Sequence, residues 1–466
     1  MPGGLWSDGQ LRARIGVGLL VFAYLVILRT RHISETFWLL GDQILYWKMA
    51  LAPWRDLPLG GGPSSVGGTT LGPTFVWVLW GIRHAVGPWT DNLPHAGGIG
   101  LSVIQSAADA VLLVAIWKRF TSLALALAVT LLVATAPYDM ALTATIWNPP
   151  LAVALVKATI ALVLLGDRHA SVWWGAGATA TALLAAQTHS SAVFVAAPAI
   201  VSFTARELLA HRRDRALRYA CASAAVIVVL EAPFLYDLAM HPGKQTSPPV
   251  VARNVSYTIA HPESLRPFAA LRAVRAACEF ILLRPWTFAW FGALLASCAV
   301  LTSFRMRHDV TLVCVTVVPL LCAAAGFSFW QQAFDHYWFL TIAPSAALTM
   351  ALALTAWRPA APFAATVLAL LVLAAQPSRV ADAMTFHRLP QYGPLVRGSR
   401  EIRRRVSEVR SVDTQLALPA STDPLFVYKI LGGRVTADAM FAATIESTGR
   451  VRFDLAAGRE GRGRVE

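Results

Sequence analysis

One carboxylate in this sequence stands in a setting suited to proton transfer beside a membrane. Asp42 follows a glycine and opens the stretch from Gln43 to Ala50, which has the composition of a short helix. A carboxylate at that position can cap the helix by accepting backbone N–H bonds at its positive end. It could equally abstract a proton from an acceptor hydroxyl or amine. The residues alone leave both roles open.

Cationic candidates gather in the segment 236–286. Basic residues outnumber acidic ones there, and we single out Lys244, Arg253 and Arg266 as ligands for a phosphate group. Arginine pairs with phosphate through bidentate, charge-assisted hydrogen bonds. Contact with lipid headgroups is the alternative. His336 and Tyr337 begin a late apolar run and are further phosphate candidates, although an aromatic residue at that place can also anchor the chain in the interface.

Two ionisable residues fall inside apolar runs, where charges are costly. Asp109 and Lys157 each sit near the middle of such a run. We expect a structural ion pair between neighbouring helices, with a proton or substrate path as the alternative. His189 lies at the end of another run, where its side chain could line a cavity.

Composition determines the class of protein. Of 466 residues, 56% are hydrophobic and 14% are charged, and the mean hydropathy is +0.54. Soluble domains carry about 25% charged residues, so the chain is a polytopic membrane protein. Its net charge of +14 reflects basic cytoplasmic turns and contacts with anionic lipid or phosphate, and no nucleic-acid partner is expected.

Basic residues alternate along the chain in a way that predicts topology. Connections near residues 118–119, 168, 206–218, 305–307 and 358 are basic, whereas those around 137–148, 187–190 and 330–336 contain no lysine or arginine. The positive-inside rule then places the N-terminus in the cytoplasm and the C-terminus outside. The pattern predicts eleven spans, at about 15–28, 98–117, 120–136, 149–166, 171–187, 189–204, 218–235, 287–303, 310–328, 337–357 and 361–376.

Two outer segments have structure of their own. Residues 29–97 hold two apolar stretches, 42–52 and 72–86, which we expect to be helices lying in the membrane interface. The spans form a membrane domain over residues 1–376. Residues 377–466 are richer in charge and are expected to form a small outer α/β domain, with a helix at 395–410, a strand at 415–419 and a helix at 424–431 that ends at Gly432.

This order of elements resembles the GT-C glycosyltransferases, especially the branch of protein mannosyltransferases and lipid A aminoarabinose transferases. The residues that carry the resemblance are Gly41-Asp42-Gln43 with Tyr46, which follow the first outward span, and Leu71–Trp77, which is similar to the branch's Lys-Pro-Pro-Leu-x-x-Trp segment. His336-Tyr337 with Pro344 is similar to the start of a late span in that branch.

The resemblance implies an all-α, GT-C-like membrane enzyme of a bacterial inner membrane. Such an enzyme transfers a sugar, usually with inversion, from a polyprenyl-phosphate donor to an acceptor outside the cytoplasm, which can be a glycan, lipid or protein. By position, Asp42 matches the catalytic aspartate of the first outer loop. Gln43, Tyr46, Asn148 and His189 are expected to line the cavity.

The chain also departs from the family pattern. Gln43 stands where a glutamate is usual, Asn148 stands where an acidic residue is frequent, and Leu71-Gly72 replaces the lysine region. Divalent cations prefer several oxygen ligands that include carboxylates. No cofactor is therefore assigned, and a divalent metal is doubtful. A transporter or lipid flippase is the alternative function, and a non-enzymatic assembly factor is a third.

Overall fold

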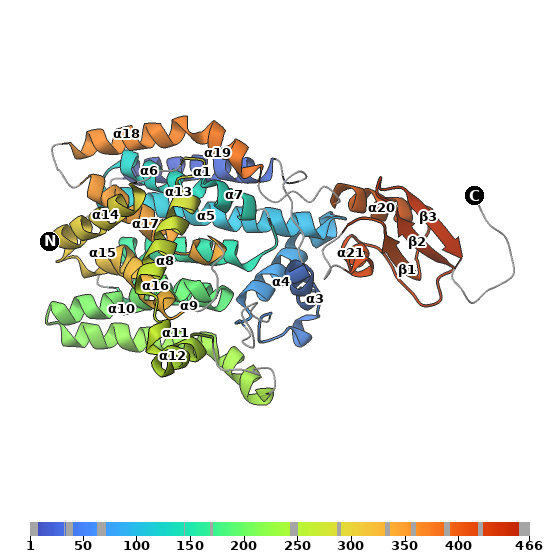
Figure 1. Ribbon diagram of the computed structural model, residues 1–466, viewed down its shortest axis with the longest axis horizontal. Helices are drawn as coiled ribbons and strands as arrows, with labels where there is room; N and C mark the ends of the chain where they lie inside the picture. The colour runs from blue at the N-terminus through green and yellow to red at the C-terminus, as the bar shows by residue number, and fades with distance from the viewer. Residues whose placement is uncertain are drawn as a thin grey trace.

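Figure 1 shows the computed structural model of the protein. The structure describes residues 8–31, 33, 41–62, 71–143, 145–167, 171–242, 250–286, 290–330, 336–355, 360–385, 392–417 and 423–455. A bundle of helices forms the larger part, and a small sheet with two helices lies beyond one end of it. The prediction that concerns Lys244 falls outside the described residues.

Each of the eleven predicted spans contains at least one helix. Among the described residues, five stretches are long and apolar enough to cross a membrane, and seven qualify if each of two bent helix pairs counts as one span. The number of crossings and their orientation therefore stay predictions. The bundle's longer helices are α1 (Asp8–Thr30), α5 (Leu93–Phe120), α8 (Asn148–Gly166), α9 (Val172–Thr188), α10 (Val193–Leu209) and α11 (Arg213–Met240).

Two predicted spans, 120–136 and 361–376, each end at a sharp bend into a further short helix. Helix α6 (Leu123–Ala134) turns by 61° into the short α7 (Pro137–Thr143), and α18 (Ala361–Ala374) turns by 46° into α19 (Gln376–Ala383). The buried guanidinium of Arg379 in α19 donates to the carbonyls of Leu132 and Thr135 at the first bend, at 2.8 and 3.1 Å. One side chain thus satisfies backbone acceptors that the bend leaves free.

Another predicted span is split in two. Helix α15 (Val310–Val315) ends at Thr316, and α16 (Val317–Ser328) begins directly after it. Pro319 explains the break, because it lacks a backbone N–H and its ring clashes with the carbonyl four residues earlier. The other helices of this half of the chain are α14 (Phe291–Met306) and α17 (Ala343–Leu354).

Helix α8 lies in the middle of the bundle. It packs against α5, α9, α10 and α15, and all but a few of its side chains are buried. An apolar sequence on every side of the helix is typical of a buried or membrane-spanning helix, and α8 qualifies as both. The few polar groups on α8 therefore need partners inside the protein.

The first outer loop contains the two predicted interfacial helices. These are α3 (Gly41–Ala50) and α4 (Thr74–Val86), joined through η1 (Trp54–Asp56) and followed by η2 (Gly87–Trp89). The ring of Trp47 is fully buried against the backbone of Gly97 in α5, where an added Cβ would lie 2.7 Å from it. Figure 1 shows α3 and α4 between the bundle and the sheet.

The segment after α11 returns to the bundle through two further helices, α12 (Val250–Ala260) and α13 (Pro267–Leu282), with η5 (Pro262–Ser264) between them. Helix α13 packs against α14, α16 and α17, and the residues it buries include Val274 and Ile281. Two single-turn helices lie nearby, η3 (Ser190–Ala192) after α9 and η6 (His336–Phe339) before α17.

The C-terminal part is an α/β unit, as predicted. It consists of α20 (Tyr392–Arg405), β1 (Ser411–Thr414), α21 (Pro424–Ile430), β2 (Phe441–Ile445) and β3 (Val451–Leu455). Strand β2 is central, parallel to β1 and antiparallel to β3. Helix α21 ends before Gly432, whose φ of +84° needs a glycine.

One detail of that prediction is wrong. The strand expected at residues 415–419 lies at Ser411–Thr414. Its ladder with β2 closes at Thr414 and Ile445, and the N–H of Gln415 makes one last bond to the carbonyl of Ile445. The strand is placed by pairing with a distant segment, which a local pattern does not contain. The division of the chain at residue 376 stays a prediction.

Candidate functional site

Asp42 lies in the first turn of α3 and its side chain is exposed. No hydrogen bond or ion pair ties its carboxylate to any other part of the chain that the structure describes. In the first turn of a helix a carboxylate lies near the free backbone N–H groups at the positive end of the helix dipole. An accessible carboxylate without a fixed partner in the described residues meets the first requirements of a general base.

The next two predicted residues of α3 point into the protein. Gln43 is fully buried, and neither its amide nitrogen nor its amide oxygen has a hydrogen-bond partner among the described residues. Tyr46 is buried against Phe75 of α4, with ring centroids 4.7 Å apart. Burial, and then the charge of Asp42, raise the pKa of Tyr46 well above its ordinary value, so its phenol stays protonated.

Residues 60–62 and 71–72 of the first outer loop pair with each other between α3 and the bundle, and we call these five residues the strap. The N–H of Gly61 donates to Leu71 O at 2.6 Å, and the N–H of Leu71 donates to Gly62 O at 3.2 Å. An added Cβ on Gly62 would lie 3.0 Å from the ring of Tyr46, and one on Gly72 would lie 2.6 Å from Gln187. The strap therefore approaches side chains on both sides too closely for any larger residue.

Polar side chains at the ends of α9 and α11 lie under this strap. The amide of Gln187 accepts a hydrogen bond from Thr74 of α4 at 2.6 Å and donates one to Glu231 at 3.2 Å. Asp237 is buried beneath Gly60 and lies 3.1 Å from the imidazole of His241. Sequence reasoning gave Asp237 and His241 no role, because a lone Asp and His one turn apart are common on any helix.

The predicted residues Asn148 and His189 lie side by side in this layer. Asn148 begins α8 and donates to the carbonyl of Thr188 at 2.8 Å. His189 is buried, and its Nδ1 lies 2.7 Å from the hydroxyl of Ser191 and accepts the backbone N–H of the same residue at 3.3 Å. Because Nδ1 is an acceptor, the ring proton of neutral His189 resides on Nε2.

A buried cluster of four charges lies deeper in the bundle. Lys157 contacts Asp109 at 2.8 Å, which confirms the predicted pairing, and Arg29 contacts the other oxygen of Asp109 at 2.7 Å. Asp139 of α7 completes the cluster, at 3.3 Å from Arg29, and accepts a hydrogen bond from Gln105 at 2.7 Å. Two cations and two carboxylates neutralise one another, as a structural role requires.

Arg29 and Asp139 were not predicted as members of this cluster. Arg29 stands at the end of the first apolar run, where a basic residue ordinarily belongs to the interface. Asp139 belongs to a predicted outer connection, and only the bend between α6 and α7 folds it back into the bundle. A sharp bend after Ala136-Pro137 is the one signal that could have located it.

The predicted phosphate ligands lie on neighbouring elements. Arg253 is exposed on α12, and Arg266 is exposed directly before α13, where its N–H donates to Ser328 O of α16 at 3.1 Å. His336 and Tyr337 begin η6. The structure thus groups the backbones of these residues around the end of α16, and their roles stay predictions.

The described residues contain no group of three His, Cys, Asp or Glu side chains that could hold a metal ion. Gln43 and Asn148 supply amides where carboxylates would serve a divalent cation better, and Asp139 is engaged with Arg29 and Gln105. The described residues of this layer therefore do not fit a divalent metal.

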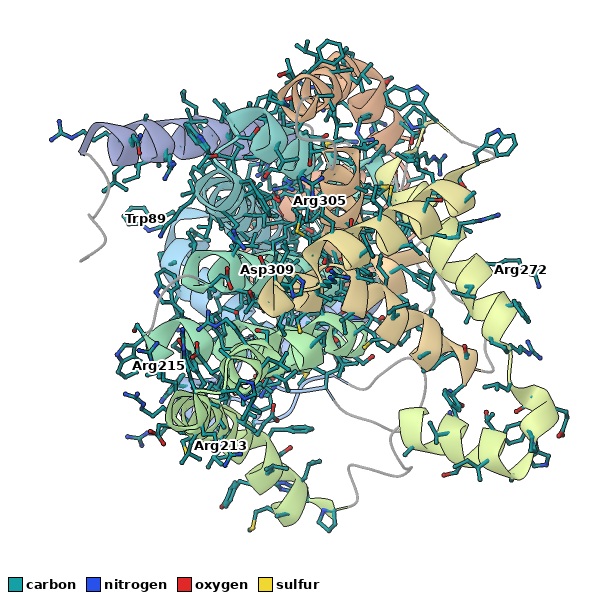
Figure 2. The ribbon with its side chains drawn as sticks, turned by 90° about the vertical axis from the view of Figure 1, so that its left-hand side faces the viewer. Trp89, Arg213, Arg215, Arg272, Arg305 and Asp309 are labelled. Atoms are coloured by element: carbon teal, nitrogen blue, oxygen red, sulfur yellow. The ribbon has the colours of Figure 1, made fainter. Side chains whose placement is uncertain are left out.

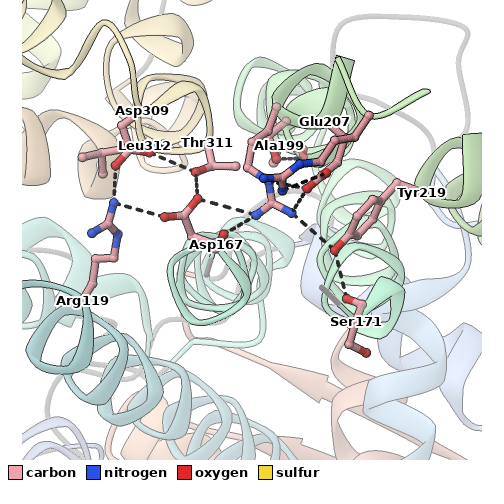
Figure 3. A network of polar contacts seen from close by, with 12 residues as sticks. Arg119, Asp167, Ser171, Ala199, Glu207, Tyr219, Asp309, Thr311 and Leu312 are labelled. Carbon is pink, nitrogen blue, oxygen red and sulfur yellow. Dashed lines mark hydrogen bonds and ion pairs between the residues drawn. The ribbon is translucent and has the colours of Figure 1, made fainter. Parts of the chain in front are cut away.

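The opposite end of the bundle is basic. Figure 2 looks onto that end and shows Arg213, Arg215 and Arg305 there with Asp309. Basic turns predicted for one side of the membrane therefore lie together. Figure 3 shows the ion pairs that join the helices at this end: Arg119 pairs with Asp309 and, at 3.1 Å, with Asp167.

Comparison with solved structures identifies the fold, whereas no protein-family model and no curated protein sequence matches the chain. The oligosaccharyltransferase of Archaeoglobus fulgidus, in complex with Zn and sulfate, matches with a TM-score of 0.54 at 13% identity, over 92% of this chain and 67% of that one. Apo ArnT from Cupriavidus metallidurans matches with a TM-score of 0.53 at 12% identity, over 92% and 85%.

A third structure is AglB from Archaeoglobus fulgidus, in complex with an inhibitory peptide and a dolichol-phosphate. Its TM-score is 0.51 at 13% identity, over 90% of this chain, and this chain spans 61% of the AglB chain. All three matches cover at least 90% of this chain. The protein has a GT-C-like fold.

Proposed function

We propose that the protein is a membrane glycosyltransferase that uses a polyprenyl-phosphate sugar donor and an acceptor outside the cytoplasm. The observation that carries the proposal is Asp42, an exposed carboxylate in the first turn of the first interfacial helix of a GT-C-like fold. With the N-terminus in the cytoplasm, as the basic turns predict, Asp42 lies at the outer surface of the inner membrane.

The proposed reaction is an inverting substitution at the anomeric carbon. Asp42 removes the proton from the acceptor hydroxyl, and the oxygen attacks C1 of the sugar from the face opposite the phosphate. The bond between C1 and the phosphate oxygen breaks, and its electron pair leaves with the polyprenyl phosphate. Arg253 and Arg266 neutralise the departing charge. The dolichol-phosphate bound to AglB supports a lipid phosphate as the carrier.

The experiment uses the full-length protein in liposomes. Undecaprenyl phosphate carrying mannose, glucose or arabinose serves as donor, and a bacterial envelope extract supplies acceptors. Release of undecaprenyl phosphate is measured by mass spectrometry. The variant Asp42→Asn keeps the shape and the capping ability of the residue. We expect transfer to fall about 10²–10⁴-fold, the usual contribution of a general base.

Asp56→Asn is the matched control, since Asp56 is an exposed acidic residue of the same loop. It should transfer at the wild-type rate. Equal rates for Asp42→Asn and the wild type would reduce Asp42 to a helix cap and contradict the mechanism. Absence of transfer by the wild type from all three donors would contradict the proposed function.

A further inference from the structure

A cavity of about 390 Å³ lies at the basic end of the bundle, where the ends of five helices meet. Helices α5, α14 and α17 end at it, and α6 and α18 begin beside it. Its walls include Phe120, Ser122, Arg305, Thr355 and Ala361. Figure 2 looks onto this end and labels Arg305. The cavity therefore lies at the opposite end of the bundle from α3, α4 and the C-terminal sheet.

Arg305, in the last turn of α14, brings a positive charge to this cavity. Its half-buried guanidinium donates one bond within the described residues, from Nη1 to the carbonyl of Thr355 at 3.4 Å. Asp309, the nearest acidic residue along the chain, pairs with Arg119 instead. A guanidinium carries five N–H donors, so most of those of Arg305 remain for a bound group.

Two further features of the wall suit an anion. Ser122 accepts the N–H of Leu125 at 3.2 Å, and its own O–H can be donated to a ligand. Helix α18 begins at Ala361, and Ala360 before it offers no side chain to cap the helix. The first N–H groups of a helix have no partner within it and form its positive end. Three kinds of donor thus lie at one cavity.

The rest of the wall is apolar. Leu125 of α6, Leu352 of α17 and Ala365 of α18 are buried and line the cavity together with Met306. Apolar surface is stabilised when it is removed from water, and a small hydrated anion would leave these walls wet. The ligand that matches this cavity has an apolar part beside an anionic part.

The level of the cavity in the bundle points to a lipid. Helix α5 is long and apolar enough to cross a membrane, and it ends at Phe120 in the cavity wall. The end of a membrane-spanning helix lies where the hydrocarbon core meets the headgroups. A phospholipid at that level places its phosphate and the first carbons of its chains side by side, as the two parts of the wall require.

Charge selects among phospholipids. Among the described residues that line the cavity, Arg305 is the only ionisable one, so a zwitterionic headgroup would find no carboxylate for its ammonium group. Basic cavities between helices on the cytoplasmic side bind anionic headgroups, and the basic turns predict that this end is cytoplasmic. We infer that the cavity binds an anionic phospholipid of the cytoplasmic leaflet, with Arg305 paired with its phosphate. This inference is independent of the proposed function.

Such a lipid contacts the ends of five helices at once. Helices α14 and α18 come from a distant part of the sequence relative to α5 and α6, so only the folded bundle presents the site. A ligand that binds the folded state and not the unfolded chain stabilises the folded state. The melting temperature therefore reports binding of the lipid.

The test measures the melting temperature of the full-length protein in dodecyl maltoside micelles, titrated with dioctanoyl phosphatidylglycerol. The wild type should show a saturable rise. Dioctanoyl phosphatidylcholine should raise the melting temperature less at every concentration, and inorganic phosphate should leave it unchanged. Arg305→Gln keeps a polar side chain and removes the charge. Its half-saturating concentration of phosphatidylglycerol should rise about tenfold to hundredfold, the effect of losing a hydrogen bond to a charged group.

Arg307→Gln is the matched control, because Arg307 is exposed just after the same helix, outside the cavity wall, and the change in net charge is the same. Its half-saturating concentration should equal that of the wild type. Ala361→Leu tests the cavity without a change of charge, since a larger side chain at the start of α18 fills part of it. This variant should bind both phospholipids more weakly, and it decides the question if Arg305→Gln does not fold.

Three results would overturn the inference. The first is the wild-type half-saturating concentration in folded Arg305→Gln or, if that variant does not fold, in Ala361→Leu. The second is an equal loss of affinity in Arg305→Gln and Arg307→Gln, which would show attraction to the basic surface as a whole. The third is equal stabilisation by phosphatidylcholine or by inorganic phosphate, which would assign the cavity to lipid of any charge or to a soluble anion.

Discussion

Arg400 of α20 donates two parallel hydrogen bonds to Asp91, with Nε and Nη2 each 2.9 Å from a carboxylate oxygen. Asp91 lies two residues before the start of α5, and its neighbour Asn92, which caps that helix, accepts a hydrogen bond from Tyr392 at 2.5 Å. The C-terminal unit is therefore fastened to the first outer loop at the point where the loop re-enters the bundle.

The contact between Arg400 and Asp91 should weaken at acidic pH. The hydrogen bond from Arg400 is the main cause that lowers the pKa of Asp91 below its ordinary value of 3.8. A lowered pKa means that the pair stabilises the docked state above that ordinary value and that the contribution is lost as the pH falls through the lowered pKa. Hydrogen exchange in α20 should accelerate over that acid range.

The variant Arg400→Ala should show the faster exchange already at neutral pH. The pair is partly exposed, so we expect a loss of about 1 kcal/mol or less. Arg397→Ala is the control, since Arg397 is exposed on the same helix and, within the described residues, makes one long bond, to Thr448 O. Identical exchange in both variants would show that Arg400 does not hold the unit in place.

The buried charge cluster predicts a stability pattern. Lys157→Ala or Asp109→Ala alone leaves an uncompensated charge in the bundle, which should cost about 3–5 kcal/mol. The double variant removes one charge of each sign and leaves Arg29 paired with Asp139 at 3.3 Å. Thermal unfolding of the purified protein should show low melting temperatures for the singles and a partial recovery for the double. Stable singles with lost function would favour the transporter alternative.

The sequence predicted those elements whose positions depend on neighbouring residues. Apolar runs located the helices of all eleven predicted spans, and the glycine pair after residue 431 located the end of α21. It did not predict features that depend on contacts with distant segments or on a local helix break. Pairing with β2 sets the position of β1, and Pro319 splits a run that hydropathy treats as continuous.

The candidate site shows the same division. The position of Asp42 in the first turn of an interfacial helix follows from residues 41–50 alone. The burial of Gln43 and the pairing of Arg29 with Asp109 do not, because each depends on which helices pack together. A buried amide and a surface amide look alike in a sequence, since only the tertiary fold determines solvent access.

The glycine strap gives the last prediction. Gly72→Ala would place a Cβ 2.6 Å from Gln187, which must shift and thereby lose its 2.6 Å bond with Thr74. Because this bond joins α4 to α9, the change should displace α4, and α3 packed on it, from the bundle. Transfer in the liposome assay should fall well before the protein unfolds.

Gly81→Ala is the matched control for the strap. Gly81 lies inside α4, with nothing within 4 Å of an added Cβ. The substitution should therefore stabilise α4 slightly, by about 0.5–1 kcal/mol. Its transfer rate should equal that of the wild type. A normal rate in Gly72→Ala would mean that the contact between the strap and Gln187 does not position Asp42, and that other contacts, such as that of Trp47 with Gly97, hold α3 in place.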